Sequence, residues 1–112
     1  MDQRKRISGR AVPQWELDVS DERGVLGPLA DISLHGAKVL AYRDLVEGCE
    51  VKLQIALPTD VGLEELLCVQ AVCRWSRATA LPGRYDLGFE FNQRLSANQR
   101  HALAELVYLK SK

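Results

Sequence analysis

The chain has 112 residues, of which 46% are hydrophobic, and both values fit one globular domain rather than a disordered segment. Fifteen Lys and Arg residues balance fifteen Asp and Glu residues, and this net charge of zero argues against a binder of nucleic-acid polymers. Three cysteines without a C-x-x-C spacing, no long apolar run and no signal-peptide pattern predict a cytoplasmic protein without membrane insertion.

The first ten residues are polar and basic, and we expect residues 1–10 to form a flexible arm that precedes a single domain over residues 11–112. The basic residues of this segment are Arg4, Lys5, Arg6 and Arg10. Residues 11–19 then alternate between apolar and polar side chains, which predicts a strand with one solvated face. Residues 20–24 have the composition of a turn.

Five more segments show a strand pattern. Residues 25–33 predict the second strand, with a bulge or kink at Gly27-Pro28. The others are residues 37–41, 50–57, 66–76 and 84–91. Because closing six strands with one apolar face each buries those faces and removes unpaired edges, we expect a mainly β fold, a six-stranded antiparallel β-barrel. A two-layer α+β sheet with a helix on one face is the alternative.

The C-terminal segment predicts an amphipathic helix over residues 96–110. Ser96 and Gln99 have the spacing of a capping box, in which each side chain bonds the backbone of the other residue. Leu103, Leu106 and Val107 then follow at helical spacing. We therefore expect this helix to pack on the barrel.

Two short motifs carry the functional prediction. Arg6 and Arg10 are four residues apart, and arginine forks match phosphate oxygens and the O6 and N7 atoms of guanine. Asp31-x-Ser33-x-x-Gly36 brings a carboxylate, a hydroxyl and a glycine into one bend. Each motif also has a simpler explanation. The first suits a solvated basic terminus, and the second suits a turn in which Gly36 takes a positive φ.

In this order and spacing, and with Tyr85-Asp86-Leu87-Gly88-Phe89-Glu90-Phe91 as the last strand, the chain resembles the bacterial PilZ domain family, whose members bind the second messenger cyclic di-GMP. The resemblance extends from about Gln3 to about Leu109 and implies the PilZ barrel. It implies that Arg6 and Arg10 contact phosphates and the Hoogsteen edge of guanine. Asp31 would accept from a guanine Watson–Crick edge, Ser33 would donate to a phosphate, and Gly36 would let the ligand approach the backbone.

Two further residues are candidate ligand contacts. Lys5 stands where many family members have arginine, and lysine keeps the charge without the fork, so binding of one or two ligand molecules stays open. Strand parity places Trp75 with Cys73 on the core face, which favours packing. Trp75 also lies near a strand end beside Arg74, where some family members stack an aromatic ring on guanine.

The resemblance implies an effector that binds cyclic di-GMP, orders residues 1–10 over it, and signals through an unidentified partner protein to motility, biofilm formation or a related bacterial output. A nucleotide-blind PilZ-like adaptor, which acts only through protein–protein contacts, is the alternative. The sequence has no spacing typical of a metal site and no nucleophile near a candidate base. We therefore expect no catalytic residues, no metal and no cofactor, and a protein that is not an enzyme.

Overall fold

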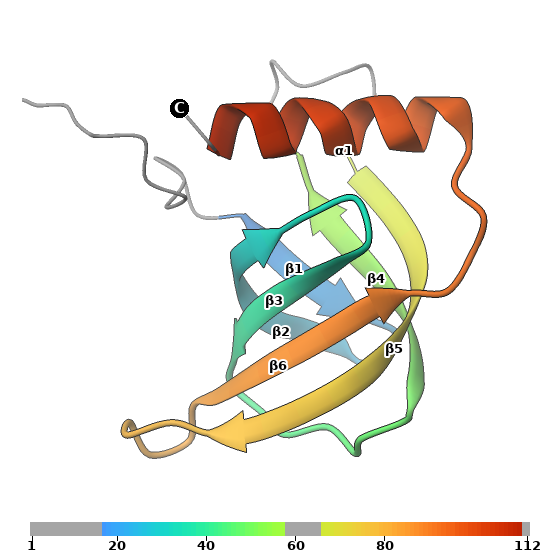
Figure 1. Ribbon diagram of the computed structural model, residues 1–112. Helices are drawn as coiled ribbons and strands as arrows, with labels where there is room; N and C mark the ends of the chain where they lie inside the picture. The colour runs from blue at the N-terminus through green and yellow to red at the C-terminus, as the bar shows by residue number, and fades with distance from the viewer. Residues whose placement is uncertain (1–16, 58–65, 111–112) are drawn as a thin grey trace, which may run out of the picture.

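The computed structural model describes residues 17–57 and 66–110, and within them the chain forms six strands and one helix (Figure 1). The elements in chain order are β1 (Asp18–Asp21), β2 (Gly24–Ile32), β3 (Gly36–Ala41), β4 (Glu50–Ala56), β5 (Leu66–Ala78), β6 (Tyr85–Phe91) and α1 (Ala97–Lys110). Residues 11–16 of the first predicted strand lie outside the described residues.

The strands form a closed antiparallel barrel in the order β1-β2-β3-β6-β5-β4, and β1 pairs with β4 to complete the ring. The predicted barrel is therefore confirmed, and the two-layer sheet is wrong. Alternation explains the closure, because Val51, Leu53 and Ile55 of β4 are buried inside while Glu50 and Lys52 point to solvent. The side chains of all six strands fill the interior, so function has to reside on the outer surface.

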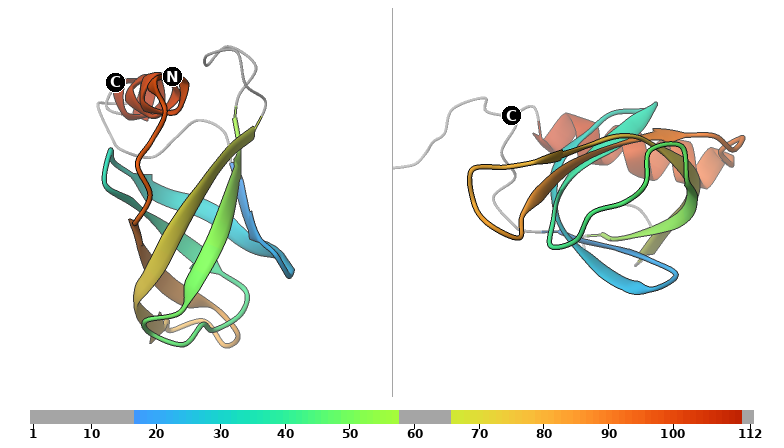
Figure 2. Two further views of the ribbon diagram at one scale, coloured as in Figure 1. Left: turned by 90° about the vertical axis from the view of Figure 1, so that its right-hand side faces the viewer. Right: turned by 90° about the horizontal axis from the view of Figure 1, so that it is seen from below.

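The helix α1 lies across one end of the barrel (Figure 2). The predicted capping box is present: the Gln99 amide donates to Ser96 Oγ at 3.1 Å, and the Ser96 amide donates to Gln99 Oε1 at 2.9 Å. Leu103 and Leu106 are buried among the core residues of the barrel. Gln99 Nε2 also donates to the carbonyl of Cys68 on β5 at 2.7 Å, which fixes the start of the helix. No helix of the described residues has the length and apolarity to cross a membrane.

The predicted turn at residues 20–24 is shorter in the structure, because Gly24 already belongs to β2. Ser20 and Asp21 belong to β1, and Glu22 and Arg23 form the turn. Asp21 is buried, and Arg43, after β3, donates to its two carboxylate oxygens at 2.6 and 3.2 Å. A charged residue stays in the strand because an arginine 22 positions later neutralises it.

The predicted bulge near Gly27-Pro28 is confirmed. Val19 pairs with Gly27 and Ser20 pairs with Val25, so Leu26 is the extra residue on β2. A Cβ atom on Gly27 would lie 2.2 Å from the carbonyl oxygen of Leu40, so glycine permits the close approach of β3. The bend in β2 helps the pair of β1 and β2 to curve and close the barrel.

Candidate functional site

A pocket of about 410 Å³ lies on the outer wall of the barrel and is formed by β2, β3, β5 and β6 and the turn between β2 and β3. We call it the wall pocket. Its lining includes Asp31, Ser33, Gly36 and Trp75. The fold therefore brings together four of the residues that the sequence singled out, although more than 40 positions separate Trp75 from Asp31. The other three candidates, Lys5, Arg6 and Arg10, lie outside the described residues.

The turn between β2 and β3 orients the polar groups of the second motif. Ser33 Oγ accepts from the amides of His35 at 3.1 Å and Gly36 at 3.3 Å, and the Ser33 amide donates to the Gly36 carbonyl at 2.9 Å. Asp31 Oδ1 accepts from the Ile32 amide at 2.9 Å. Asp31, Ser33 and His35 are exposed, so a rigid turn presents a carboxylate and a hydroxyl to solvent.

Position 36 of this motif requires glycine for a different structural reason from the one expected for a turn. Gly36 is the first residue of β3 and is not among the glycines with positive φ, so that part of the turn interpretation is wrong. A Cβ atom on Gly36 would lie 2.1 Å from the carbonyl oxygen of Phe89. Glycine is required because the first residue of β3 lies directly against the backbone of β6.

The core-facing parity predicted for Trp75 is wrong. Cys73 pairs with Phe89 and Trp75 pairs with Gly88, so Arg74 is an extra residue that reverses the parity of β5. The indole consequently lies on the outer wall, against the bare backbone of Gly88. A Cβ atom on Gly88 would lie only 2.2 Å from Cε2 of the indole. The glycine thus makes room for an aromatic surface in the wall pocket.

The pairing of four strands arranges the pocket residues in one row. Asp31 on β2 pairs with Lys38 on β3, Lys38 pairs with Gly88 on β6, and Gly88 pairs with Trp75 on β5. A carboxylate therefore lies at one end of the row and an indole at the other, with a lysine between them. Sequence reasoning missed Lys38 and Gly88. The signal for Gly88 was a glycine inside an otherwise regular strand pattern.

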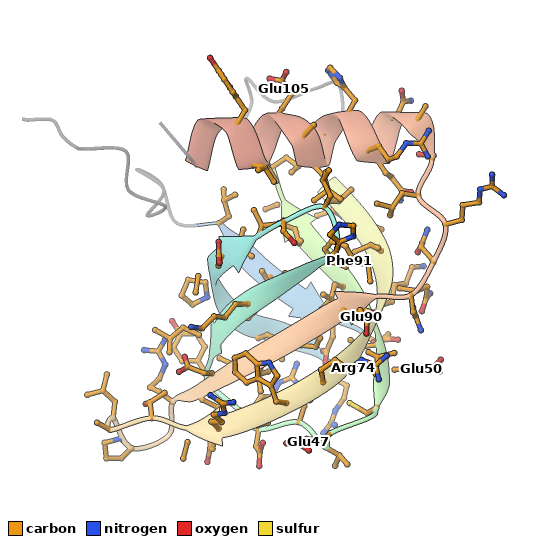
Figure 3. All side chains as sticks on the ribbon, viewed as in Figure 1. Glu47, Glu50, Arg74, Glu90, Phe91 and Glu105 are labelled. Atoms are coloured by element: carbon orange, nitrogen blue, oxygen red, sulfur yellow. The ribbon has the colours of Figure 1, made fainter. Side chains whose placement is uncertain are left out.

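An ion pair lies beside this row. Arg74 Nε donates to Glu90 Oε1 at 2.5 Å, and both side chains are more than half exposed at the edge of the wall pocket (Figure 3). The pocket therefore has two carboxylates, Asp31 and Glu90, and two cationic side chains, Lys38 and Arg74. These formal charges cancel, so the described lining offers no net positive charge to an anionic ligand.

The nearest thiol is not a suitable nucleophile. Cys73 is buried in the barrel core, and burial raises the pKa of its thiol to about 11, with smaller contributions from Cys49 and Glu47. Its Sγ donates to the carbonyl of Trp75 at 3.5 Å. Because the thiolate is the reactive form, this group stays inert at neutral pH. Among the described residues, no three His, Cys, Asp or Glu side chains are grouped to hold a metal ion.

The chain thus forms a small closed barrel with an open pocket on its outer wall and a helix across one end. The family model described as the PilZ domain matches residues 4–109, and the chain belongs to this family. Domains of this family are receptors and adaptors that bind cyclic di-GMP and partner proteins.

Among solved structures, the chain is similar to the Bacillus subtilis inhibitor of motility (MotI/DgrA), with a TM-score of 0.66 and 24% sequence identity. The similarity covers 94% of this chain and 51% of that chain, so this protein spans about half the length of its structural neighbour. At this identity the likeness concerns the fold. No protein in the curated set matches the chain.

Proposed function

We propose that this protein is a receptor for cyclic di-GMP. The observation that carries the proposal is the convergence of Asp31, Ser33 and Trp75 in one open pocket. A carboxylate accepts from the N1–H and N2–H groups of guanine, a hydroxyl donates to a phosphate, and an indole stacks on a purine. The carboxylate, the hydroxyl and the indole thus match the base edge, the phosphate and the base face of a guanine nucleotide, in that order.

The N-terminal segment supplies the remaining charge in this proposal. The formal charges of the described pocket residues cancel, whereas cyclic di-GMP has two phosphodiester charges. Arg6 and Arg10 would donate their forks to the phosphates and to guanine, and Lys5 would add charge without a fork. Residues 1–10 would thereby become ordered over the ligand and create a surface that is absent without it.

A partner protein would read this surface, because the proposed role includes no reaction. Motility and biofilm formation are the outputs that we propose, and the name of the Bacillus neighbour, an inhibitor of motility, agrees with the first. The coarser statement, a receptor or adaptor domain, follows from the family alone. The test of ligand binding therefore decides between a receptor and a nucleotide-blind adaptor.

Calorimetric titration with cyclic di-GMP tests the proposal, with separate titrations of GTP and cyclic GMP as specificity controls. We expect a Kd in the micromolar range or below for cyclic di-GMP only. Asp31→Ala should weaken binding by about tenfold or more, because the guanine edge loses a charged acceptor. Asp18→Ala, at an exposed position of β1 outside the pocket lining, is the matched control. Absence of heat with folded wild-type protein at high micromolar ligand would contradict the proposal and favour the adaptor.

The contact between Gly88 and Trp75 gives a second prediction. Gly88→Ala places a methyl group where the indole lies, and the ring has to move because three of its atoms are within 2.6 Å of that position. We expect cyclic di-GMP affinity to fall by about fivefold to tenfold, within the range for one base–aromatic stack. The midpoint of thermal unfolding should change little, since a surface ring can move into solvent.

The measurement combines calorimetry with tryptophan fluorescence in a Trp15→Phe background, which leaves Trp75 as the only tryptophan. Gly88→Ala should shift the emission maximum to longer wavelength as the indole becomes more exposed. Trp75→Ala should weaken binding to the same extent. Full affinity in both variants would show that the indole takes no part in the site.

A further inference from the structure

We propose that Lys38 is a further ligand-contacting residue of the wall pocket and that its ammonium group binds a phosphate of the cyclic dinucleotide. This role depends on the proposed function and adds a contact that neither sequence motif contains. It also explains how a pocket wall with balanced charges offers a local positive centre.

The position of Lys38 follows from two strand pairings. On one side Lys38 pairs with Asp31, because an extra residue on β2, Ala30, shifts the register there. On the other side Lys38 pairs with Gly88, which carries no side chain. Directly opposite residues of an antiparallel pair have Cβ atoms about 5 Å apart. The lysine therefore projects from the outer wall between the acceptor for a guanine edge and the indole of Trp75.

The charge of Lys38 is less compensated than that of the other pocket cation. Arg74 already donates its Nε to Glu90 at 2.5 Å. Within residues 17–57 and 66–110, Lys38 makes no hydrogen bond and no ion pair like the one between Arg74 and Glu90. It is exposed, as a strand position on the outer face should be. Even with Asp31 directly opposite on β2, an ammonium that donates to no described group has donors left for an anion.

The chemistry of lysine favours a phosphate as its contact. The ammonium group has three donors, no acceptor and a compact charge, so it cannot pair with the N1–H and N2–H groups of guanine. Those groups have Asp31 as a nearby acceptor. The phosphate oxygens carry the negative charge of the ligand and can be reached by a flexible side chain, so Lys38 would contact a phosphate as a point charge.

The test compares Lys38→Ala with Lys52→Ala by calorimetric titration with cyclic di-GMP. Lys52 is exposed on the outer face of β4, pairs with Gln70 and is not in the pocket lining, so each variant removes one positive charge from a strand surface. We expect Lys38→Ala to raise the Kd about tenfold, as for the loss of one charge-assisted hydrogen bond. Lys52→Ala should change it less than about twofold.

A salt series adds a readout that a purely structural role would not change. Raising the ionic strength from about 50 to about 500 mM screens exposed charges, so it should weaken the wild type more than Lys38→Ala. Lys38→Gln, which keeps most of the side chain, should behave like Lys38→Ala, and this variant decides the question if alanine disturbs folding. Lys38→Arg should retain most of the affinity.

The outcomes separate the two proposals. Normal binding by the wild type, together with equal Kd values for the Lys38 and Lys52 variants, would overturn the role of Lys38 and leave the receptor function intact. Absence of binding by the wild type would overturn the receptor function and the role of Lys38 with it.

Discussion

Replacing Arg43 with alanine is expected to lower the free energy of unfolding by about 3 kcal/mol at neutral pH. The side chain of Asp21 is only 1% exposed, and Arg43 donates to both of its oxygens. Without Arg43, this buried carboxylate keeps a hydrogen bond from the amide of Arg23. Because Arg43 itself is 29% exposed, water can partly replace it, and we expect the lower end of the range for broken buried pairs.

Urea denaturation followed by circular dichroism measures this loss. Arg94→Ala removes the same side chain from an exposed loop position and should change the free energy of unfolding by less than about 0.5 kcal/mol. Equal midpoints for the two variants would mean that the Arg43–Asp21 pair contributes nothing to stability.

The effect of Arg43→Ala should depend on pH. Burial raises the pKa of Asp21. Hydrogen bonds from Arg43 and the Arg23 amide, together with the charges of both arginines, lower this pKa by more, so it lies below the usual value of 3.8. The pair therefore stabilises the protein fully above pH 3.8 and loses this contribution as the pH falls through the lowered pKa. We expect the difference between wild type and Arg43→Ala to shrink below about pH 4. A difference independent of pH would contradict the role of the Asp21 charge.

The sequence was sufficient for the architecture because that part of the fold depends on local patterns. Alternation with a period of two in β4 and β6 determines which side chains face the interior. The capping box at Ser96 and Gln99 involves residues three positions apart, and it marks the start of α1. With six half-apolar strands, closure into a barrel is the arrangement that buries every apolar face.

The sequence was insufficient where long-range register matters. One extra residue, Arg74, moves Trp75 from the core face of β5 to the outer face, and no local sequence pattern predicts this bulge. Asp21 is in a polar run that has the composition of a turn, and its partner Arg43 is 22 positions away. The row of Asp31, Lys38, Gly88 and Trp75 exists only once four strands have paired. Bulges and cross-strand neighbours are thus the part of the site that a one-dimensional pattern does not contain.

Replacing Arg6 and Arg10 together with alanine is expected to weaken cyclic di-GMP binding by at least about 100-fold, because two charge-assisted contacts of about 1.5 kcal/mol or more each are lost. In the proposed function Arg6 and Arg10 supply the net positive charge, since Asp31 and Glu90 offset Lys38 and Arg74 in the wall pocket. Calorimetry measures the loss, and circular dichroism should show an unchanged barrel. The variant with Arg23→Ala and Arg94→Ala removes two charges at exposed positions outside the pocket lining and is the control.

A doubly conservative variant identifies how the two arginines act. Arg6→Lys with Arg10→Lys keeps both charges and loses both forks, and we expect an affinity between those of the wild type and the double alanine variant. An affinity equal to the wild type would mean that attraction alone recruits the dinucleotide. Undiminished binding by the double alanine variant would contradict the proposed contacts and would move the required cations to Lys5, Lys38 and Arg74. Because the charge of the ligand has to be matched at some position, these variants together locate the cations that bind it.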